Sequence, residues 1–356
     1  MSNQGKKWAV QSYGPVANLQ QMDFPLPTAE NLPPKDVLVK IHTTDATYTD
    51  MLIIRGNYRP LPPCPCTPGY TCVGTVMMVG SAVSSVRVGD RIASMPQAHC
   101  YATHVVLPEH LVIKISPTVD PVKAVSVVLT GSTAYQMLHR AGGGRLTPTS
   151  RILVHACGGG TGAMIVTLAK IAGLSVNNIY GTCSEKSMAV VGKLGIKAFN
   201  YKTDDWRARV MESTHGEGVD LVFDSVFLGS YFAHGVSCLK SGGKYIAYGL
   251  TNVADAGGLH IPSVILQFMR LGFQHNVLSW FDRKQAAFFT IADERDAHPD
   301  LFRADLAVLL DLVATGDLDP VIGRVWTFDQ AKEALQSIEN NVHTAKQVIV
   351  VSTPTP

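Results

Sequence analysis

The feature that most constrains the fold of this chain is a glycine-rich turn between two apolar segments. The turn reads His155-Ala156-Cys157-Gly158-Gly159-Gly160-Thr161-Gly162 and joins an apolar strand pattern at 151–154 to a helical pattern at 162–172. In such a turn, small residues let the backbone approach a pyrophosphate, which then contacts the amides at the helix N-terminus. We therefore predict nucleotide binding here, with a flexible turn as the alternative. The candidate residues are Ala156, Gly158, Gly159, Gly160, Thr161 and Gly162.

The residues after the next predicted strand bear on the choice of nucleotide. Thr182 lies 20 residues after Gly162, where an NAD-binding protein usually has an Asp or Glu that binds the ribose 2′-hydroxyl. Here Ser184 and Lys186 follow, and both can bind the extra phosphate of NADPH. Glu185 between them either points away or indicates NAD. The pattern favours NADPH and leaves NAD open.

Two patterns of secondary structure divide the chain. The first third reads as β segments between Gly and Pro, which predicts an antiparallel barrel; the segments are 8–13, 37–43, 72–79, 91–94 and 102–108. After residue 120 a helix at 122–141 leads into alternating strands and helices, which predict a parallel βαβ sheet. The strands are 151–156, 178–182, 198–201, 219–224 and 244–249, and the helices 162–172 and 185–194. Later helices are predicted at 262–271, 300–315 and 329–339, and later strands at 325–328 and 347–351. A length of 356 residues fits two domains.

Composition excludes several classes of partner. The chain has 30 Lys and Arg against 28 Asp and Glu, without a run of like charge, so we expect neither nucleic acid nor an anionic membrane as a partner. It has no apolar stretch of membrane-spanning length and no apolar run after a basic start, which argues against a membrane span and a secretory leader. Seven scattered cysteines fit free thiols in a reducing compartment. We expect a soluble, cytoplasmic protein that acts on a small molecule.

Short motifs occur in a specific order between residues 50 and 220, within a resemblance that covers nearly the whole chain. They are Asp50 with Arg55-Gly56-Asn57-Tyr58, Pro68-Gly69, Gly74-Thr75-Val76, Val88-Gly89-Asp90-Arg91, Thr130-Gly131-Ser132-Thr133-Ala134-Tyr135, Val154-His155-Ala156 and Gly218-Val219-Asp220. Together they resemble the zinc-independent quinone oxidoreductase and enoyl reductase (zeta-crystallin-like) branch of the medium-chain dehydrogenase/reductase superfamily. The resemblance implies an α/β fold: a GroES-like β-barrel catalytic domain (1–125 and 281–356) with an inserted doubly wound Rossmann domain (126–280) that binds NADPH. It also implies an active cleft between the domains.

The resemblance also implies roles for individual residues. Tyr58 would be a proton donor, although a loop aromatic packed on the barrel is the alternative, and Tyr48 is a second hydroxyl. Tyr201 would lie beside the adenosine ribose phosphate. Further residues would border the cofactor; these are Thr130, Thr133, Leu250 and Lys346. For Lys346, contact with solvent alone is the alternative.

The chain departs from the family at several positions. Ala46 and the segment Pro68-Gly69-Tyr70-Thr71 lack the Cys, His and Glu of the zinc enzymes, and Cys64, Cys66 and Cys72 lack the spacing of a structural zinc site, so we expect no metal. Phe227 replaces the glycine that usually follows a segment like Asp224-Ser225-Val226, and we expect it to narrow the nicotinamide end of the cleft.

These observations predict an NADPH-dependent oxidoreductase that transfers hydride, without zinc, to a quinone or to the C=C bond of an α,β-unsaturated carbonyl compound. The alternatives are a pathway-specific enoyl reductase of lipid or secondary metabolism and a non-catalytic NADPH-binding protein of the crystallin or vesicle type. The resemblance further suggests a homodimer that extends the two Rossmann sheets, with residues 273–280 as the edge strand or, alternatively, as an internal strand.

Overall fold

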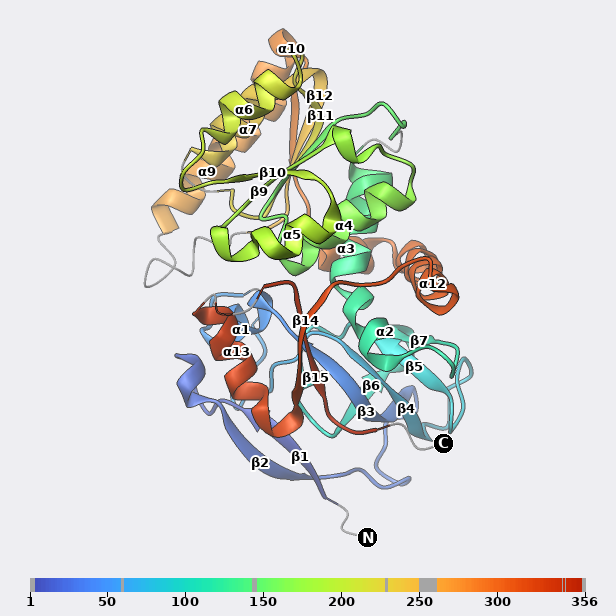
Figure 1. Cartoon of the computed structure of the whole chain (residues 1–356). Coiled ribbons are helices and arrows are strands. Elements are labelled where there is room, and N and C mark those ends of the chain that lie inside the picture. The colour runs from blue at the N-terminus through green and yellow to red at the C-terminus, as the bar shows by residue number, and fades with distance from the viewer. Residues whose placement is uncertain are drawn as a thin grey trace. The chain divides into compact units, whose positions relative to one another are not determined.

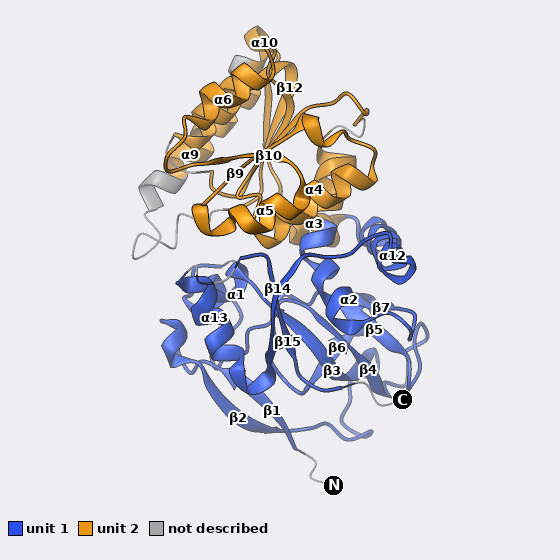
Figure 2. Cartoon of the chain, viewed as in Figure 1, with its two compact units in different colours: residues 1–132, 298–356 blue, residues 133–297 orange. Residues whose placement is uncertain are grey.

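The computed structural model describes residues 4–58, 61–142, 146–227, 230–249, 261–340, 342 and 344–353. It contains two compact units (Figure 2): residues 1–132 with 298–356, and residues 133–297. We call them unit 1 and unit 2. Both ends of the chain belong to unit 1, so unit 2 is an insertion in its sequence. The chain divides after Ser132 and after Ala297, whereas the sequence suggested boundaries after residues 125 and 280.

Unit 1 is built on a seven-stranded sheet of order β14-β15-β3-β4-β5-β7, with β6 paired to β3. All its pairs are antiparallel except β14 with β15. The strands are β3 (Asp36–Ala46), β4 (Cys72–Val79), β5 (Arg91–Ser94), β6 (His104–Pro108), β7 (Val112–Lys114), β14 (Ile322–Thr327) and β15 (Lys346–Val350). β15 pairs with β3, which confirms that the C-terminal strand returns to the first domain. A separate ribbon joins β1 (Gln4–Ala9) to β2 (Gln20–Pro25).

Two helices of unit 1 have recognisable end signals. α2 (Pro121–Val128) starts with Pro121 after an Asp120 side chain that accepts from the next backbone amides. α12 (Pro299–Thr315) ends at Gly316, whose φ of 83° is left-handed. The other helices are α1 (Tyr48–Ile54), α13 (Ala331–Glu339) and α3 (Thr130–Gln136), within which the boundary between the units falls.

Unit 2 is a doubly wound α/β sheet. Its six parallel strands have the order β10-β9-β8-β11-β12-β13. The helices α4 and α5 cover one face, and α6, α7 and α9 cover the other (Figure 1). β8 is buried over its whole length, as expected for a central strand covered on both faces. The strands are β8 (Ile152–His155), β9 (Ile179–Cys183), β10 (Lys197–Asn200), β11 (Val219–Asp224), β12 (Leu239–Ala247) and β13 (Gln285–Phe288). The helices are α4 (Gly160–Ile171), α5 (Met188–Leu194), α6 (Trp206–Ser213), α7 (Tyr231–Ser237), α9 (Ile261–Phe273), α10 (Ser279–Asp282) and α11 (Ile291–Ala297), with π-helical turns at Met137–Ala141 and Gln274–Leu278.

The predicted strand at 273–280 is wrong, because that segment is helical from α9 through the π-helical turn to α10. Ile265, Met269, Phe273 and Val277 recur every four residues and share one exposed side, which is a helical period and not the alternation of a strand. The edge strand on this side of the sheet is instead β13, which pairs with β12 alone among the described residues. None of the helices in the described ranges has the length and apolar composition needed to cross a membrane.

Candidate functional site

The glycine turn occupies the carboxyl end of β8 and leads directly into α4. Ala156 has a left-handed φ of 53°, and its carbonyl accepts from the Gly159 amide at 2.9 Å. Gly159 is the N-cap of α4 and has no side chain to satisfy the first amides of the helix. Those amides therefore stay available to an anion. The turn has the local geometry that the sequence predicted.

Two glycines of this turn have no room for a side chain. A Cβ on Gly162 would lie 2.4 Å from the Ala156 carbonyl oxygen and 2.8 Å from the Cys157 Cα, both backbone atoms. A Cβ on Gly158 would lie 2.5 Å from the Cβ of Ser187. Gly159 is exposed, whereas Gly160 and Thr161 are partly exposed. The turn is thus packed tightly against its own strand and against the segment after β9, and its outer surface is open, which fits a diphosphate.

The ends of β9 and β10 bring the predicted phosphate-binding residues together. The Tyr201 amide donates to the Cys183 carbonyl at 3.1 Å, so Tyr201 begins beside Ser184. Ser184 is partly exposed, Lys186 is exposed, and the Tyr201 ring is 41% exposed. All three are therefore accessible at one edge of the sheet. The sequence left the direction of Glu185 open, and its carboxylate accepts from Asn200 Nδ2 at 2.9 Å.

The loop after β11 is closed by its own carboxylate. Asp224 is buried and accepts from the amides of Val226 and Phe227 with one oxygen and from the Tyr245 hydroxyl with the other. Phe227 has a left-handed φ of 58° and is completely buried. Its ring packs on Phe232, Phe268 and Phe288 with centroids 5.5–6.0 Å apart. The expectation that Phe227 narrows a cleft is therefore wrong, because its ring lies in the core of unit 2.

Three further predicted residues are less informative. Thr130 and Thr133 lie on α3 and are largely buried, and the Thr130 hydroxyl donates to the Ser126 carbonyl at 2.7 Å. Leu250 lies outside the described residues. The roles suggested for all three stay predictions.

Tyr58 follows the end of α1 in unit 1. Gly56 takes a left-handed φ of 75° there, and the amides of Gly56 and Asn57 bond back to α1, which ends the helix. The Tyr58 and Tyr70 hydroxyls lie 2.7 Å apart, and their rings meet edge to face. Tyr58 is partly exposed, whereas Tyr70 is buried. A partly exposed phenol hydrogen-bonded to a buried one is chemically suited to exchange a proton. Tyr48, the first residue of α1, is also partly exposed.

A buried polar cluster in unit 1 was missed from the sequence. Lys346 forms an ion pair with Asp45, and both side chains are almost fully buried. The Thr71 hydroxyl donates to the other oxygen of Asp45. The sequence left open whether Lys346 touches the cofactor or only solvent. Its burial beside Asp45 excludes a position in solvent. An Asp and a Lys within apolar strands were the available signal, since buried charges usually occur in pairs.

Asp50 belongs to the same region and supports α1. With Thr47 it forms a reciprocal cap at the start of that helix, and its other oxygen accepts from the Gly69 amide at 3.0 Å. Burial and the neighbouring Asp45 raise the pKa of Asp50 to about 7. The Thr47 side chain accepts from the Asp50 amide and so caps the start of α1. This Asp holds the turn before Tyr70 in position.

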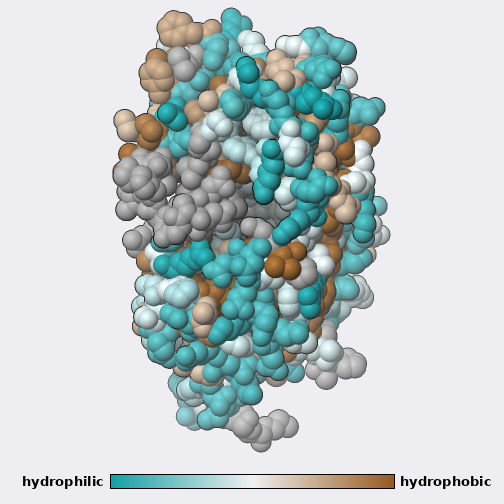
Figure 3. Space-filling view, turned by 60° about the vertical axis from the view of Figure 1, so that its left-hand side comes forward, coloured by the Kyte–Doolittle hydropathy of each residue, from teal (hydrophilic) through white to brown (hydrophobic). Residues whose placement is uncertain are grey.

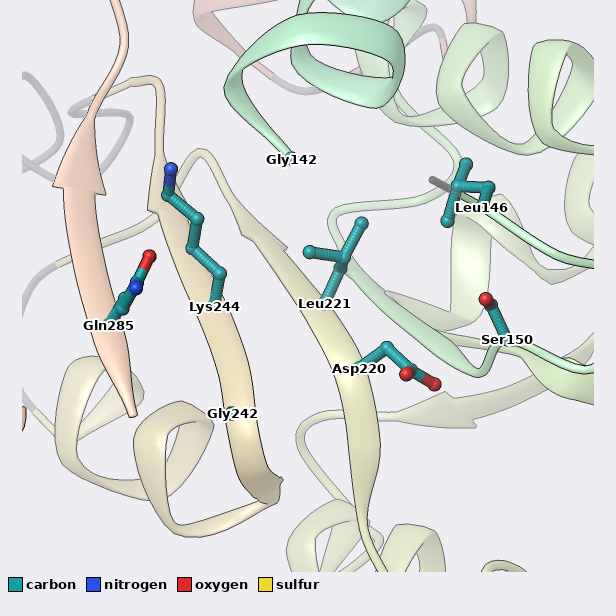
Figure 4. Close-up of a pocket in the computed structure, with 8 residues that line it drawn as sticks. All are labelled: Gly142, Leu146, Ser150, Asp220, Leu221, Gly242, Lys244 and Gln285. Carbon is teal, nitrogen blue, oxygen red and sulfur yellow. The ribbon is translucent and has the colours of Figure 1, made fainter. Parts of the chain in front are cut away.

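No metal centre emerges among the residues that the structure describes, since no three His, Cys, Asp or Glu side chains there converge as ligands. A pocket of about 280 Å³ does open in unit 2, at the amino ends of β11 and β12 (Figure 4). Its lining includes Asp220, Leu221, Lys244 and Gln285. Burial lowers the pKa of Lys244. This pocket lies at the amino ends of the strands, whereas the glycine turn lies at their carboxyl ends. None of the predicted site residues lines it.

Two family models match the chain. The alcohol dehydrogenase GroES-like domain matches residues 33–117, and the zinc-binding dehydrogenase model matches residues 194–349. The chain belongs to the medium-chain dehydrogenase/reductase superfamily. Within this superfamily it falls in the branch of quinone oxidoreductases, enoyl reductases and VAT-1 proteins. The resemblance and the fold expected from the sequence are confirmed.

Three relatives illustrate this branch. The human synaptic vesicle membrane protein VAT-1 homolog is 26% identical over 320 residues, covering 89% of this chain and 79% of the relative. The Escherichia coli quinone oxidoreductase complexed with NADPH has a TM-score of 0.82 at 19% identity, covering 97% of this chain and all of the other. The CurK enoyl reductase has a TM-score of 0.79 at 21% identity, covering 97% and 99%. At these identities the two structures show the shared fold.

Proposed function

We propose that this medium-chain dehydrogenase/reductase is an NADPH-dependent oxidoreductase that transfers hydride to a quinone or to the C=C bond of an α,β-unsaturated carbonyl compound. The observation that carries the proposal is the tightly packed glycine turn, where Gly162 and Gly158 leave no space for a Cβ and the first amides of α4 are open. A relative complexed with NADPH and a relative named as an enoyl reductase support the same reading.

The residues of unit 2 would hold the nucleotide at two places. The amides at the start of α4, from Gly160 to Gly162, would hold the diphosphate. Ser184, Lys186 and Tyr201 would surround the ribose phosphate, for which a hydroxyl, an ammonium and a phenol are suitable donors. The Glu185 carboxylate already accepts a hydrogen bond from Asn200, so it is less available to bind a ribose hydroxyl. We therefore favour NADPH over NADH. When bound, NADPH supplies the hydride.

The residues of unit 1 would provide the proton. Tyr58 would donate its hydroxyl proton to the reduced substrate, and the buried Tyr70 hydroxyl would replace it through the 2.7 Å hydrogen bond. Asp50 would act as a positioning residue, because it fixes both the start of α1 and Gly69 next to Tyr70. Nothing in this scheme uses zinc. Tyr48 would be the alternative donor.

Turnover tests the proposal directly. Purified protein is mixed with NADPH and a small panel of quinones, enones and enoyl thioesters, with NADH in parallel and a metal chelator as control. We expect oxidation of NADPH that survives the chelator, prefers NADPH over NADH, and falls at least tenfold in Tyr58→Phe. Tyr48→Phe tests the alternative donor: loss of activity in this variant, with activity kept in Tyr58→Phe, would assign the proton to Tyr48.

A second candidate function has one supporting observation. Relatives named for a vesicle membrane protein match most of the chain, which keeps a non-catalytic NADPH-binding role in view. The same assay separates the two roles. Tight binding of NADPH without oxidation by any acceptor would reject the reductase, while turnover restricted to enoyl thioesters would favour the pathway-specific enoyl reductase.

We also propose a homodimer that extends the sheet of unit 2 through β13. β13 is one of the two edge strands, and the neighbouring α9 and α10 expose large apolar side chains, including Met269, Trp280 and Phe281 at 66%, 85% and 83% exposure. Figure 3 shows one face of the molecule, with apolar residues in brown among polar ones in teal. Exposed apolar surface of this kind usually marks an interface. Sedimentation of wild type and of Trp280→Lys with Phe281→Lys tests the proposal: a dimer that the variant converts to a monomer supports it, and a monomeric wild type refutes it.

A further inference from the structure

We propose that Cys157 and Cys183 are a redox-modification site, whose two thiols form a disulfide that ties the glycine turn to the end of β9. Cys157 lies in the turn between β8 and α4, and Cys183 is the last residue of β9. Neither residue has a role in the function proposed above. The effect of the disulfide on NADPH binding rests on that proposed function, whereas the disulfide itself does not.

The backbone places the two residues within bridging distance. β8 and β9 are parallel neighbours with His155 opposite Thr182, and the Cys157 amide donates to the Thr182 carbonyl at 3.1 Å. Neighbouring strands lie about 4.8 Å apart, which is within the roughly 4.4–6.8 Å between Cα atoms that a disulfide spans. The bond therefore needs only a short local displacement of the turn toward the end of β9.

The side chains also point toward each other. The Cys157 Sγ lies 2.5 Å from the position that a Cβ on Gly181 would occupy, so the thiol rests on β9 where that glycine leaves space. Cys183 is two residues further along β9 and projects from the same face as that position. Cys183 also contacts the Met188 sulfur at 3.2 Å.

The pair is polarised in the way that oxidation requires. The interaction with the Cys157 thiol lowers the pKa of Cys183, while the same interaction and burial raise the pKa of Cys157. Cys183 is thus the better nucleophile. Both thiols are almost completely buried. Cys183, however, is followed directly by the partly exposed Ser184 and then by the exposed Glu185. Local opening of this short turn would admit a small oxidant.

The oxidant we propose is hydrogen peroxide. The Cys183 thiolate attacks one oxygen of the peroxide and the O–O bond breaks. Hydroxide is the leaving group, and Cys183 becomes a sulfenic acid. The Cys157 thiol then attacks that sulfur, the S–O bond breaks, and water leaves as the disulfide forms. In total two thiols lose two electrons and two protons, and one peroxide becomes two waters. A dithiol reductant reverses the reaction by thiol–disulfide exchange.

Closing the bond would deform the predicted cofactor site on both sides. A disulfide holds its sulfurs about 2.05 Å apart, which is closer than two thiols in contact. The residues that follow the two cysteines are Gly158 in the turn and Ser184 at the predicted phosphate site. We therefore expect NADPH to bind the oxidised protein at least tenfold more weakly. We also expect bound NADPH to slow the oxidation, since it would cover this edge.

The experiment treats the reduced, cofactor-free protein with hydrogen peroxide and maps disulfides by peptide mass spectrometry. The expected product links the peptides of Cys157 and Cys183, is reversed by dithiothreitol, and is absent from Cys183→Ser and from Cys157→Ser. The matched control Cys64→Ser removes a partly exposed thiol and should still form the link. The buried Cys72 and Cys100 belong to one hydrophobic cluster in the core of unit 1 and should stay reduced.

Each outcome decides a separate question. If no link between Cys157 and Cys183 forms while other thiols oxidise, or if Cys72 and Cys100 link first, the site is refuted. If the link forms but reduced and oxidised protein bind NADPH equally, the regulatory effect is refuted. If the link forms and even the reduced protein does not bind NADPH, the proposed function fails and the modification site stands.

Discussion

Replacing Gly162 by Ala tests the packing of the glycine turn. The new Cβ would lie 2.4 Å from the Ala156 carbonyl oxygen and 2.8 Å from the Cys157 Cα, whereas ordinary contact begins near 3.4 Å. Because both neighbours are backbone atoms, α4 has to move away from β8. Such overpacking costs about 1–3 kcal/mol, and an overlap of this size with backbone belongs at the upper end. Against this, Ala is better than Gly in a helix by about 1 kcal/mol.

The free energy of unfolding should therefore fall by about 2 kcal/mol, which lowers the unfolding temperature of a unit of this size by roughly 4–8 °C. The displaced α4 amides would also lose hydrogen bonds to a charged diphosphate, each worth about 1.5–3 kcal/mol. NADPH should therefore bind roughly 10- to 150-fold more weakly. The assays are differential scanning calorimetry and fluorescence titration with NADPH.

Gly192→Ala is the matched control for this substitution. Gly192 lies within α5, has no atom within 4 Å of an added Cβ, and does not have a left-handed φ. That variant should unfold at the same or a higher temperature and bind NADPH normally. If Gly162→Ala behaves like Gly192→Ala in both assays, the close approach of α4 to β8 is not what the turn requires, and the reasoning is refuted.

Three further predictions concern buried groups. Lys346→Met leaves Asp45 buried without its cation and should lower the unfolding free energy of unit 1 by about 3–5 kcal/mol, while Asp45→Asn combined with Lys346→Met should recover at least half, as measured by urea denaturation. Phe227→Ala removes a fully buried ring from an aromatic cluster and should cost unit 2 about 3–5 kcal/mol; a loss below 1 kcal/mol would contradict that packing. Burial lowers the pKa of His42 to about 4, so the unfolded chain takes up the proton first and stability should fall as the pH drops from about 6.5 to about 4. His42→Gln should flatten this dependence in urea titrations, and an unchanged slope would contradict it.

The sequence predicted the elements of unit 2 well because its strands are short apolar runs between turn residues. β11 matches its predicted bounds, as do β4 and β5 in unit 1. The failure at 273–280 has a physical cause: the apolar character of the segment suggested a strand, whereas Phe273 and Val277 lie four residues apart, which is a helical spacing. Similarly, the first strand begins at Gln4 and not at residue 8, because its pairing with β2 includes polar residues that carry no apolar signal.

The candidate site was only partly readable. Glycines indicate where the backbone approaches another group closely, so the sequence predicted the turn and its neighbours. The Asp45–Lys346 pair joins residues about 300 positions apart, and no local pattern reports such a contact. The position of Phe227 failed for a related reason. Its replacement of a glycine suggested an intrusion into open space, whereas its left-handed backbone turns the ring into the core.

Two left-handed residues that are not glycine lie at the carboxyl edge of this sheet, and each is held by contacts of the chain itself. Ala156 ends β8 and Phe227 follows β11, its neighbour in the sheet. Such a conformation costs on the order of 1 kcal/mol or more. For Ala156 the hydrogen bond from Gly159 offsets this cost, and for Phe227 the aromatic packing and the Asp224 carboxylate do so. Because these contacts need no ligand, the edge has its shape before a nucleotide binds, and the cost of ordering it does not have to come from binding energy.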